Sequence, residues 1–190
     1  TNNLNDQISI KVNPVPTSII SGGGSICDDG SEVDIYINTI SGTPPFNIQY
    51  SIGIQTKNLL NIGYNHSFST KEAGQYSLTE IFDSKGCKAN TNGLANVHIN
   101  PVPQADFTFF PQPVDVNNPL VFFVDQSLYH SSGYWDFGDN SPLVNTNFGE
   151  ISHLYPSQDS GTYSVSLVIS TDSGCINSIT KQIVVNESFS

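Results

Sequence analysis

Apolar and polar residues alternate along several short stretches of the chain. In the first half, Val33, Ile35 and Ile37 alternate with polar neighbours, and a second alternating run covers 46–52. In the second half, the same period of two appears at 105–109 and 164–170, whereas 121–124 and 183–185 are short runs in which every residue is apolar. A period of two with one apolar face predicts antiparallel strands that are half buried. No stretch keeps an apolar period of 3.6 residues for more than one turn, so an all-β fold is expected.

One run breaks this alternation. Tyr76 and Leu78 point to the same side of their predicted strand, and Glu80 would follow them into the core. We predict a β-bulge that turns Glu80 outward and Ile81 inward. A functional buried glutamate at this position is the alternative interpretation.

Internal repeats indicate the number of domains. Three short segments recur in the same order with a period of about 87 residues. These pairs are Asn13-Pro14-Val15-Pro16 with Asn100-Pro101-Val102-Pro103, Gly74-Gln75-Tyr76 with Gly161-Thr162-Tyr163, and Gly86-Cys87 with Gly174-Cys175. We therefore expect two tandem modules, at 14–101 and 102–190, each entered through a stiff proline connector. Residues 1–13, in which Ile8, Ile10 and Val12 alternate, are expected to be a linker or the last strand of a preceding module.

Composition restricts the possible partners. The chain has 6 basic residues against 17 acidic ones, a net charge of −11, and all six bases are lysine. This acidity disfavours binding to nucleic acid or to an anionic membrane surface. No apolar run approaches the roughly 18 residues of a membrane span. The N-terminus does not read as a signal peptide, so we expect a segment of a longer, secreted protein.

A motif in the second half carries a resemblance to a known family. Trp135-Asp136-Phe137-Gly138-Asp139 is followed by His153-x-Tyr155 and then by Gly161-x-Tyr163. Together these segments resemble the PKD domain, an immunoglobulin-like β-sandwich of extracellular proteins. The first half resembles the Ig-like repeats of very large bacterial surface proteins that use type IX secretion, through segments such as Gly42-Thr43-Pro44-Pro45-Phe46 and Gly74-Gln75-Tyr76. The implied fold is two tandem immunoglobulin-like antiparallel β-sandwiches.

The sequence offers few groups for chemistry. Asp136 and Asp139 are weak candidates for Ca²⁺ ligands, and hydrogen bonding within their turn is the alternative. No other metal site or cofactor is expected, because the four histidines lack the spacing of a zinc site. The resemblance implies a structural role for His153. Tyr76 and Tyr163 resemble the tyrosine corner of Ig-like sandwiches, in which the hydroxyl binds upstream backbone. No catalytic residue is identified.

The three cysteines are assigned from the resemblance. Similar surface modules pair the positions of Cys27 and Cys87, so this disulfide is expected, and Cys175 is expected to be a free thiol or to pair outside the chain. A bond between Cys87 and Cys175 is the alternative. It would require two loops of different modules to bring their Cα atoms within about 7 Å.

The resemblance implies a non-catalytic stalk or spacer segment of a large cell-surface adhesin, exported by type IX secretion and associated with gliding motility. Its expected partners are neighbouring modules, with a surface glycan or the secretion and motility machinery as further candidates. The alternative function is an accessory module pair of a secreted polysaccharidase or protease that binds glycan through exposed aromatic residues. Candidates for such a platform are Tyr36, Tyr64 and Tyr129.

Overall fold

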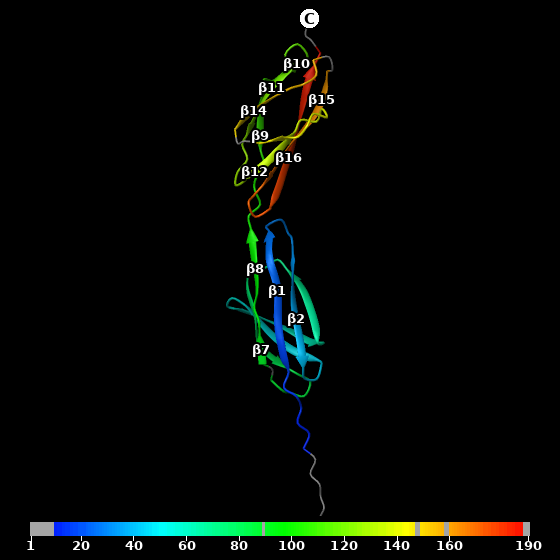
Figure 1. Ribbon diagram of the computed structural model, residues 1–190, viewed down its shortest axis with the longest axis vertical. Coiled ribbons are helices and arrows are strands. Elements are labelled where there is room, and N and C mark those ends of the chain that lie inside the picture. The colour runs from blue at the N-terminus through cyan, green and yellow to red at the C-terminus, as the bar shows by residue number, and fades with distance from the viewer. Residues whose placement is uncertain (1–9, 89, 147–148, 158–159, 188–190) are drawn as a thin grey trace, which may run out of the picture. The chain divides into compact units, whose positions relative to one another are not determined.

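The computed structural model describes residues 10–88, 90–146, 149–157 and 160–187 (Figure 1). This part of the chain contains β-strands and no helix. It divides into two compact units, one comprising residues 1–26 and 30–99 and the other comprising 27–29 and 100–190. The small segment Cys27–Asp29 therefore groups with the second unit, although it lies far from it in the sequence.

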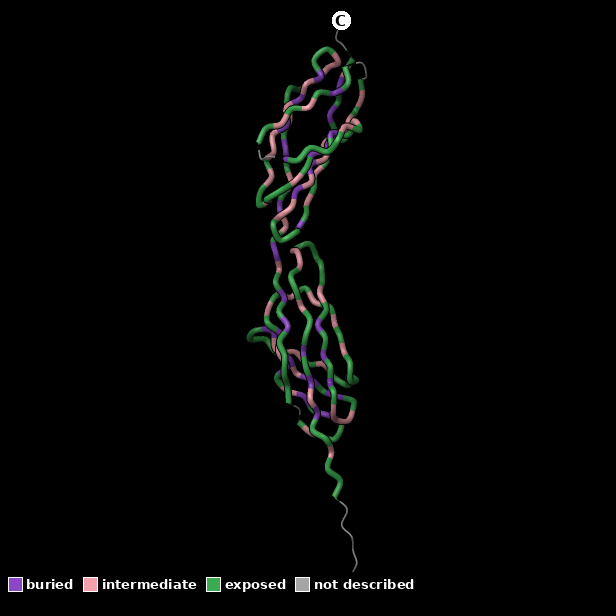
Figure 2. The backbone as a smooth tube through the Cα atoms, viewed as in Figure 1, coloured by how far each residue is buried: buried purple, intermediate pink, exposed green. Residues whose placement is uncertain are grey.

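The first unit contains eight strands. They are β1 (Thr17–Cys27, whose last residue lies in the second unit), β2 (Val33–Ser41), β3 (Phe46–Ile52), β4 (Gln55–Ile62), β5 (Asn65–Thr70), β6 (Gly74–Phe82), β7 (Asn90–Asn92) and β8 (Ala95–Asn100, also ending in the second unit). Pairing follows the order β4-β3-β6-β8-β1-β2-β5, and β7 pairs with β1 in parallel. The strands enclose a core of alternating residues that includes Ile35, Ile37, Phe46 and Ile48. Buried positions alternate with exposed ones along these strands in Figure 2.

The second unit contains the other eight strands. They are β9 (Phe107–Phe110), β10 (Val114–Asp115), β11 (Leu120–Asp125), β12 (Ser132–Asp136), β13 (Val144–Asn145), β14 (Glu150–Leu154), β15 (Gly161–Ser170) and β16 (Ile176–Asn186). A five-stranded sheet has the order β10-β16-β15-β12-β13, and a three-stranded sheet has the order β14-β11-β9. Their facing side chains form one aromatic-rich core around Trp135, so this unit is also a β-sandwich.

The bulge predicted in β6 is confirmed. The register of β6 against β3 shifts between Gln49 and Tyr50, so that Gln49 pairs with Glu80 and Tyr50 pairs with Leu78. Ile81 is consequently buried, and Glu80 turns outward and forms an ion pair with Lys88 at 2.9 Å. The alternative of a buried functional glutamate is therefore wrong.

β1 was not expected from the pattern of apolar residues. Its middle is Gly22-Gly23-Gly24, a composition that strands generally avoid, and all three glycines have positive φ. At Gly22 and Gly23 the lack of a side chain is also required by the close approach of neighbouring backbone. A Cβ on Gly22 would lie 2.4 Å from the Asp34 carbonyl oxygen, and a Cβ on Gly23 would lie 2.3 Å from that of Asn96.

The structure describes only part of residues 1–13, for which a linker or a strand was predicted. Ile8 and the rest of 1–9 lie outside the described residues. Residues 10–16 are not in a strand, and Ile10 and Val12 are exposed. Whether residues 1–13 are a linker or the last strand of a preceding module stays a prediction.

Candidate functional site

The turn after β12 is held by its own acidic residues. Trp135 and Phe137 point into the core, and the intervening Asp136 points outward. The carboxylate of Asp136 accepts the backbone N–H of Gly138 at 2.9 Å, and that of Asp139 accepts the N–H of Ser141 at 3.0 Å. Gly138 has a φ of 73°, and a Cβ there would lie 2.5 Å from the Ser164 carbonyl oxygen. Only glycine therefore fits this turn without strain.

His153 fixes the second oxygen of Asp139. Its Nε2 lies 2.7 Å from Oδ2 of Asp139, and its ring stacks on Phe137 with centroids 4.0 Å apart. Burial raises the pKa of the Asp139 carboxyl, but hydrogen bonds from Ser141 and His153 outweigh burial and bring this pKa below its usual value. Both Ca²⁺ candidates are thus engaged in protein hydrogen bonds. In the described ranges no three His, Cys, Asp or Glu side chains are grouped as metal ligands would be.

The motif tyrosines bind backbone or pack in the core. The Tyr155 hydroxyl donates to the Phe137 carbonyl at 3.2 Å, and burial raises the pKa of this tyrosine. The Tyr76 hydroxyl donates to the Glu72 carbonyl at 2.8 Å, which is the contact that a tyrosine corner requires. Tyr163 packs on Tyr155 with ring centroids 4.4 Å apart. Gly74 and Gly161 open strands β6 and β15, as the matching Gly-x-Tyr segments suggested.

A second histidine–aspartate pair was not predicted. Nε2 of His130 lies 3.2 Å from Oδ2 of Asp125, and the side chains are only 7% and 2% exposed. Asp125 also accepts hydrogen bonds from the Thr146 hydroxyl at 3.2 Å and from the Ser127 N–H at 2.9 Å. A substrate cannot reach a pair that is enclosed in this way, so its chemistry is structural. The only sequence signal was the Asp125-Gln126-Ser127 segment after the predicted strand.

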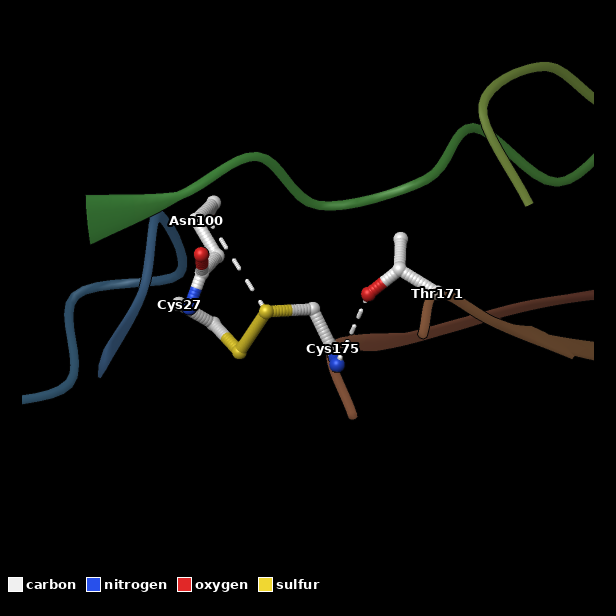
Figure 3. The surroundings of a disulfide bond; sticks show 4 residues. All are labelled: Cys27, Asn100, Thr171 and Cys175. Atoms are coloured by element: carbon white, nitrogen blue, oxygen red, sulfur yellow. Dashed lines mark hydrogen bonds between the residues drawn. A yellow bond between two sulfur atoms is a disulfide. The ribbon is translucent and has the colours of Figure 1, made fainter. Parts of the chain in front are cut away.

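The predicted cysteine pairing is wrong. Cys27 is bonded to Cys175, with Cα atoms 5.6 Å apart, and Cys87 is the free cysteine (Figure 3). Cys175 ends the turn between β15 and β16. In that turn the Thr171 hydroxyl accepts the Cys175 N–H at 3.1 Å, and the Asn100 carbonyl oxygen lies 3.9 Å from Sγ of Cys175. The Asp28 N–H donates to the same carbonyl at 2.9 Å, which holds the Cys27–Asp29 segment in place.

The length of β1 explains the error. Cys87 lies in the turn after β6, close to the start of β1, since the Asn90 N–H donates to the Pro16 carbonyl at 3.1 Å. Cys27 is the last residue of β1, ten residues further on, and a strand of this length spans about 33 Å. A disulfide requires Cα atoms within about 7 Å, so Cys27 and Cys87 cannot meet. The alternative pair, Cys87 with Cys175, is also absent.

The three tyrosines named as candidates for a glycan platform differ in their surroundings. Tyr64 donates its hydroxyl to the Gly42 carbonyl at 3.0 Å and packs edge-on against Phe46. Tyr129 is 73% exposed and has a φ of 61° in the loop after β11. Tyr36 lies in the middle of β2, on the outer face of the sheet, and its hydroxyl donates to the Asp34 carboxylate at 3.3 Å. Of these three tyrosines, Tyr36 is thus the one that lies within a strand, on the surface of a regular sheet.

Comparison with known proteins identifies the second unit. Residues 100–186 match the family model of the PKD domain. The chain is similar to the solved PKD1 domain of Vibrio anguillarum Epp, with 25% identity over 47% of this chain and 99% of that one, at a TM-score of 0.38. It is also similar to a structure described as carbohydrate-binding modules of the β-sandwich superfamily, with 30% identity over 46% of this chain and 35% of that one, at a TM-score of 0.40.

A broader similarity extends over both units. A Ca²⁺-stabilised adhesin with which an Antarctic bacterium binds ice is 12% identical over 93% of this chain and 50% of that one, at a TM-score of 0.48. No curated protein matches the chain. No helix in the described ranges has the length and hydropathy needed to cross a membrane. The range matched by the family model contains the Trp135 turn and the other motif residues. The chain therefore carries a PKD domain at residues 100–186.

Proposed function

We propose that this chain is a non-catalytic spacer segment of a large extracellular adhesin at a bacterial cell surface. The observation that carries the proposal is the repeat itself: an Asn-Pro-Val-Pro connector precedes each of two β-rich stretches, and each unit has its own apolar core. Modules that bury their own cores can be added in series without a new interface for each addition. Such a series extends a binding domain away from the cell.

The site geometry supports a spacer. The motif side chains Trp135, Asp139, His153 and Tyr155 are directed at one another or at backbone, and the buried pair of His130 and Asp125 is enclosed. Hydrogen bonds of this kind stabilise a fold and bind no substrate. The disulfide fits an oxidising compartment outside the cytoplasm.

The finer part of the proposal is export by type IX secretion in a gliding bacterium. It is supported by the resemblance of segments such as Gly42-Thr43-Pro44-Pro45-Phe46 to repeats of such surface proteins. The test is antibody labelling of intact cells of the source organism with serum raised against this chain. Labelling should be strong on intact cells and lost in a strain without the type IX secretion apparatus.

Two results would contradict this proposal. Label that appears only after cell lysis would refute a surface location, and surface label that persists in the secretion mutant would refute the export route. Gliding is tested separately, by tracking cells that lack the gene encoding the chain. Unchanged movement of those cells would remove motility from the proposal and leave the spacer role in place.

A further inference from the structure

The outer face of β1, β2 and β5 combines an exposed aromatic ring with hydrogen-bonding side chains. Tyr36 on β2 pairs across the sheet with Ser21 on β1 and Ser67 on β5, and Asn38 on β2 pairs with Asn65 on β5. A hollow in the surface is lined by these five residues together with Ile37 and His66. We call the set Ser21, Tyr36, Asn38, Asn65 and Ser67 the Tyr36 face, and all five of its residues are exposed.

The ring of Tyr36 lies down on the sheet. A Cβ built on Gly22 would be 3.0 Å from Cδ2 of Tyr36, so the ring occupies the space above Gly22 that a side chain would fill. At its other end, the hydroxyl reaches along the same strand to Asp34, whose second oxygen accepts the Ser69 hydroxyl at 2.7 Å. The hydroxyl of Tyr36 is thus hydrogen-bonded to Asp34, and Tyr36 remains 49% exposed.

An exposed ring bordered by amides and hydroxyls matches the chemistry of a sugar. The C–H groups on one face of a pyranose pack on an aromatic ring, and its hydroxyls need both donors and acceptors at the edges. The amides of Asn38 and Asn65 supply both kinds of group, and the Asp34 carboxylate is an acceptor. The hydrogen bond of the Tyr36 hydroxyl to Asp34 restricts the side chain before binding, which lowers the entropy cost of binding.

The length of the outer face of β2 and the net charge of the chain restrict the class of sugar that could bind. From Asp34 to Ile40 the outward residues of β2 span some 20 Å, which suits an oligosaccharide better than a monosaccharide. Ile40 is 63% exposed and provides a second apolar surface beyond Asn38. The net charge of −11 disfavours sulfated or uronic acid polymers. We propose that the Tyr36 face binds a neutral polysaccharide chain. This proposal is independent of the export route, and it gives the spacer an adhesive surface of its own.

The test is affinity electrophoresis of the whole 190-residue chain through native gels that contain one polysaccharide each. The neutral set is laminarin, hydroxyethylcellulose, galactomannan and glycogen, and alginate is the anionic comparison. At least one neutral polymer should retard the chain. Tyr36→Ala should weaken that binding by at least about tenfold, a typical effect of truncating an aromatic anchor. Tyr36→Trp should preserve it.

Two further variants make the result specific. Asn38→Ala should also weaken binding, and it replaces the Tyr36 variant if that variant fails a far-ultraviolet circular dichroism check of folding. Tyr129→Ala removes a more exposed tyrosine in the other unit and should migrate like the unmodified chain. The proposal is overturned if no neutral polymer retards the chain, if alginate alone does, or if folded Tyr36→Ala and Asn38→Ala variants are retarded as strongly as the unmodified chain. None of these three failures affects the surface-labelling test of location and export.

Discussion

Breaking the bond between Cys27 and Cys175 should destabilise the second unit selectively. Both cysteines belong to that unit, although the chain between them passes through the first unit. If the second unit unfolds while the first stays folded, only the residues between Asn100 and Cys175 become flexible. The flexible part of the loop closed by the disulfide is then on the order of 75 residues. The chain-entropy treatment then gives a loss of about 4.5 kcal/mol on reduction, and measured values are often lower.

The chain contains its own reporter for this measurement. Trp135 is its single tryptophan and is fully buried in the second unit, so its fluorescence follows the unfolding of that unit alone. With a urea m-value of about 1–2 kcal/mol/M, reduction should lower the unfolding midpoint by roughly 2–4 M. Cys27→Ser should reproduce the shift without reductant.

The free cysteine supplies the matched control. Cys87→Ser should leave the Trp135 transition unchanged, because Cys87 forms no disulfide in the structure. Peptide mapping without reduction should recover Cys27 linked to Cys175. A midpoint that is insensitive to reductant, or a mapped peptide that links Cys27 to Cys87, would refute the structural assignment.

Four other outcomes are expected. Trp135→Ala should cost roughly 3–5 kcal/mol in calorimetry, because it removes the largest side chain of a fully buried cluster; an unchanged melting temperature would refute this. Since the pKa of Asp139 is lowered by folding, its stabilisation is present above the unfolded pKa of about 3.9 and is lost as pH falls through the lower folded pKa. Asp139→Asn should therefore flatten the dependence of unfolding midpoint on pH in that acidic window, and parallel profiles would count against it. Cleavage within 100–103 followed by reduction should leave two fragments with β-sheet circular dichroism, and loss of signal in either would contradict independent folding. EDTA should leave the melting temperature unchanged, whereas a shift of several degrees would make Asp136 and Asp139 metal ligands.

Much of the fold follows from side-chain alternation. Runs such as 33–37 and 46–52 have one strongly apolar face, and these strands bury that face in the structure. The β6 bulge was also predictable, because a glutamate on the core face has no favourable location without one. In both cases the burial preference of single side chains was sufficient to determine the local structure.

The errors arose where backbone geometry controls the structure. β1 was missed because its three glycines add nothing to the alternation of apolar and polar side chains that predicts a strand. Gly22 and Gly23 instead allow the backbone of neighbouring strands to approach closely. Without that strand, Cys27 could not be placed relative to Cys87, and the disulfide prediction failed. His130 and Asp125 meet only through the arrangement of β11 and its following loop, which spacing in a single sequence does not encode.

The disulfide also determines how the chain carries mechanical load. Tension applied at the two termini passes along the chain to Cys27, crosses the sulfur atoms to Cys175 and leaves through β16, so the covalent path bypasses the residues between them. The bond joins positions 148 residues apart. Without the bond, that segment could unfold under tension and extend to about 500 Å. An oxidised chain therefore has a short, fixed limit of extension, and reduction converts the same polypeptide into a long extensible tether.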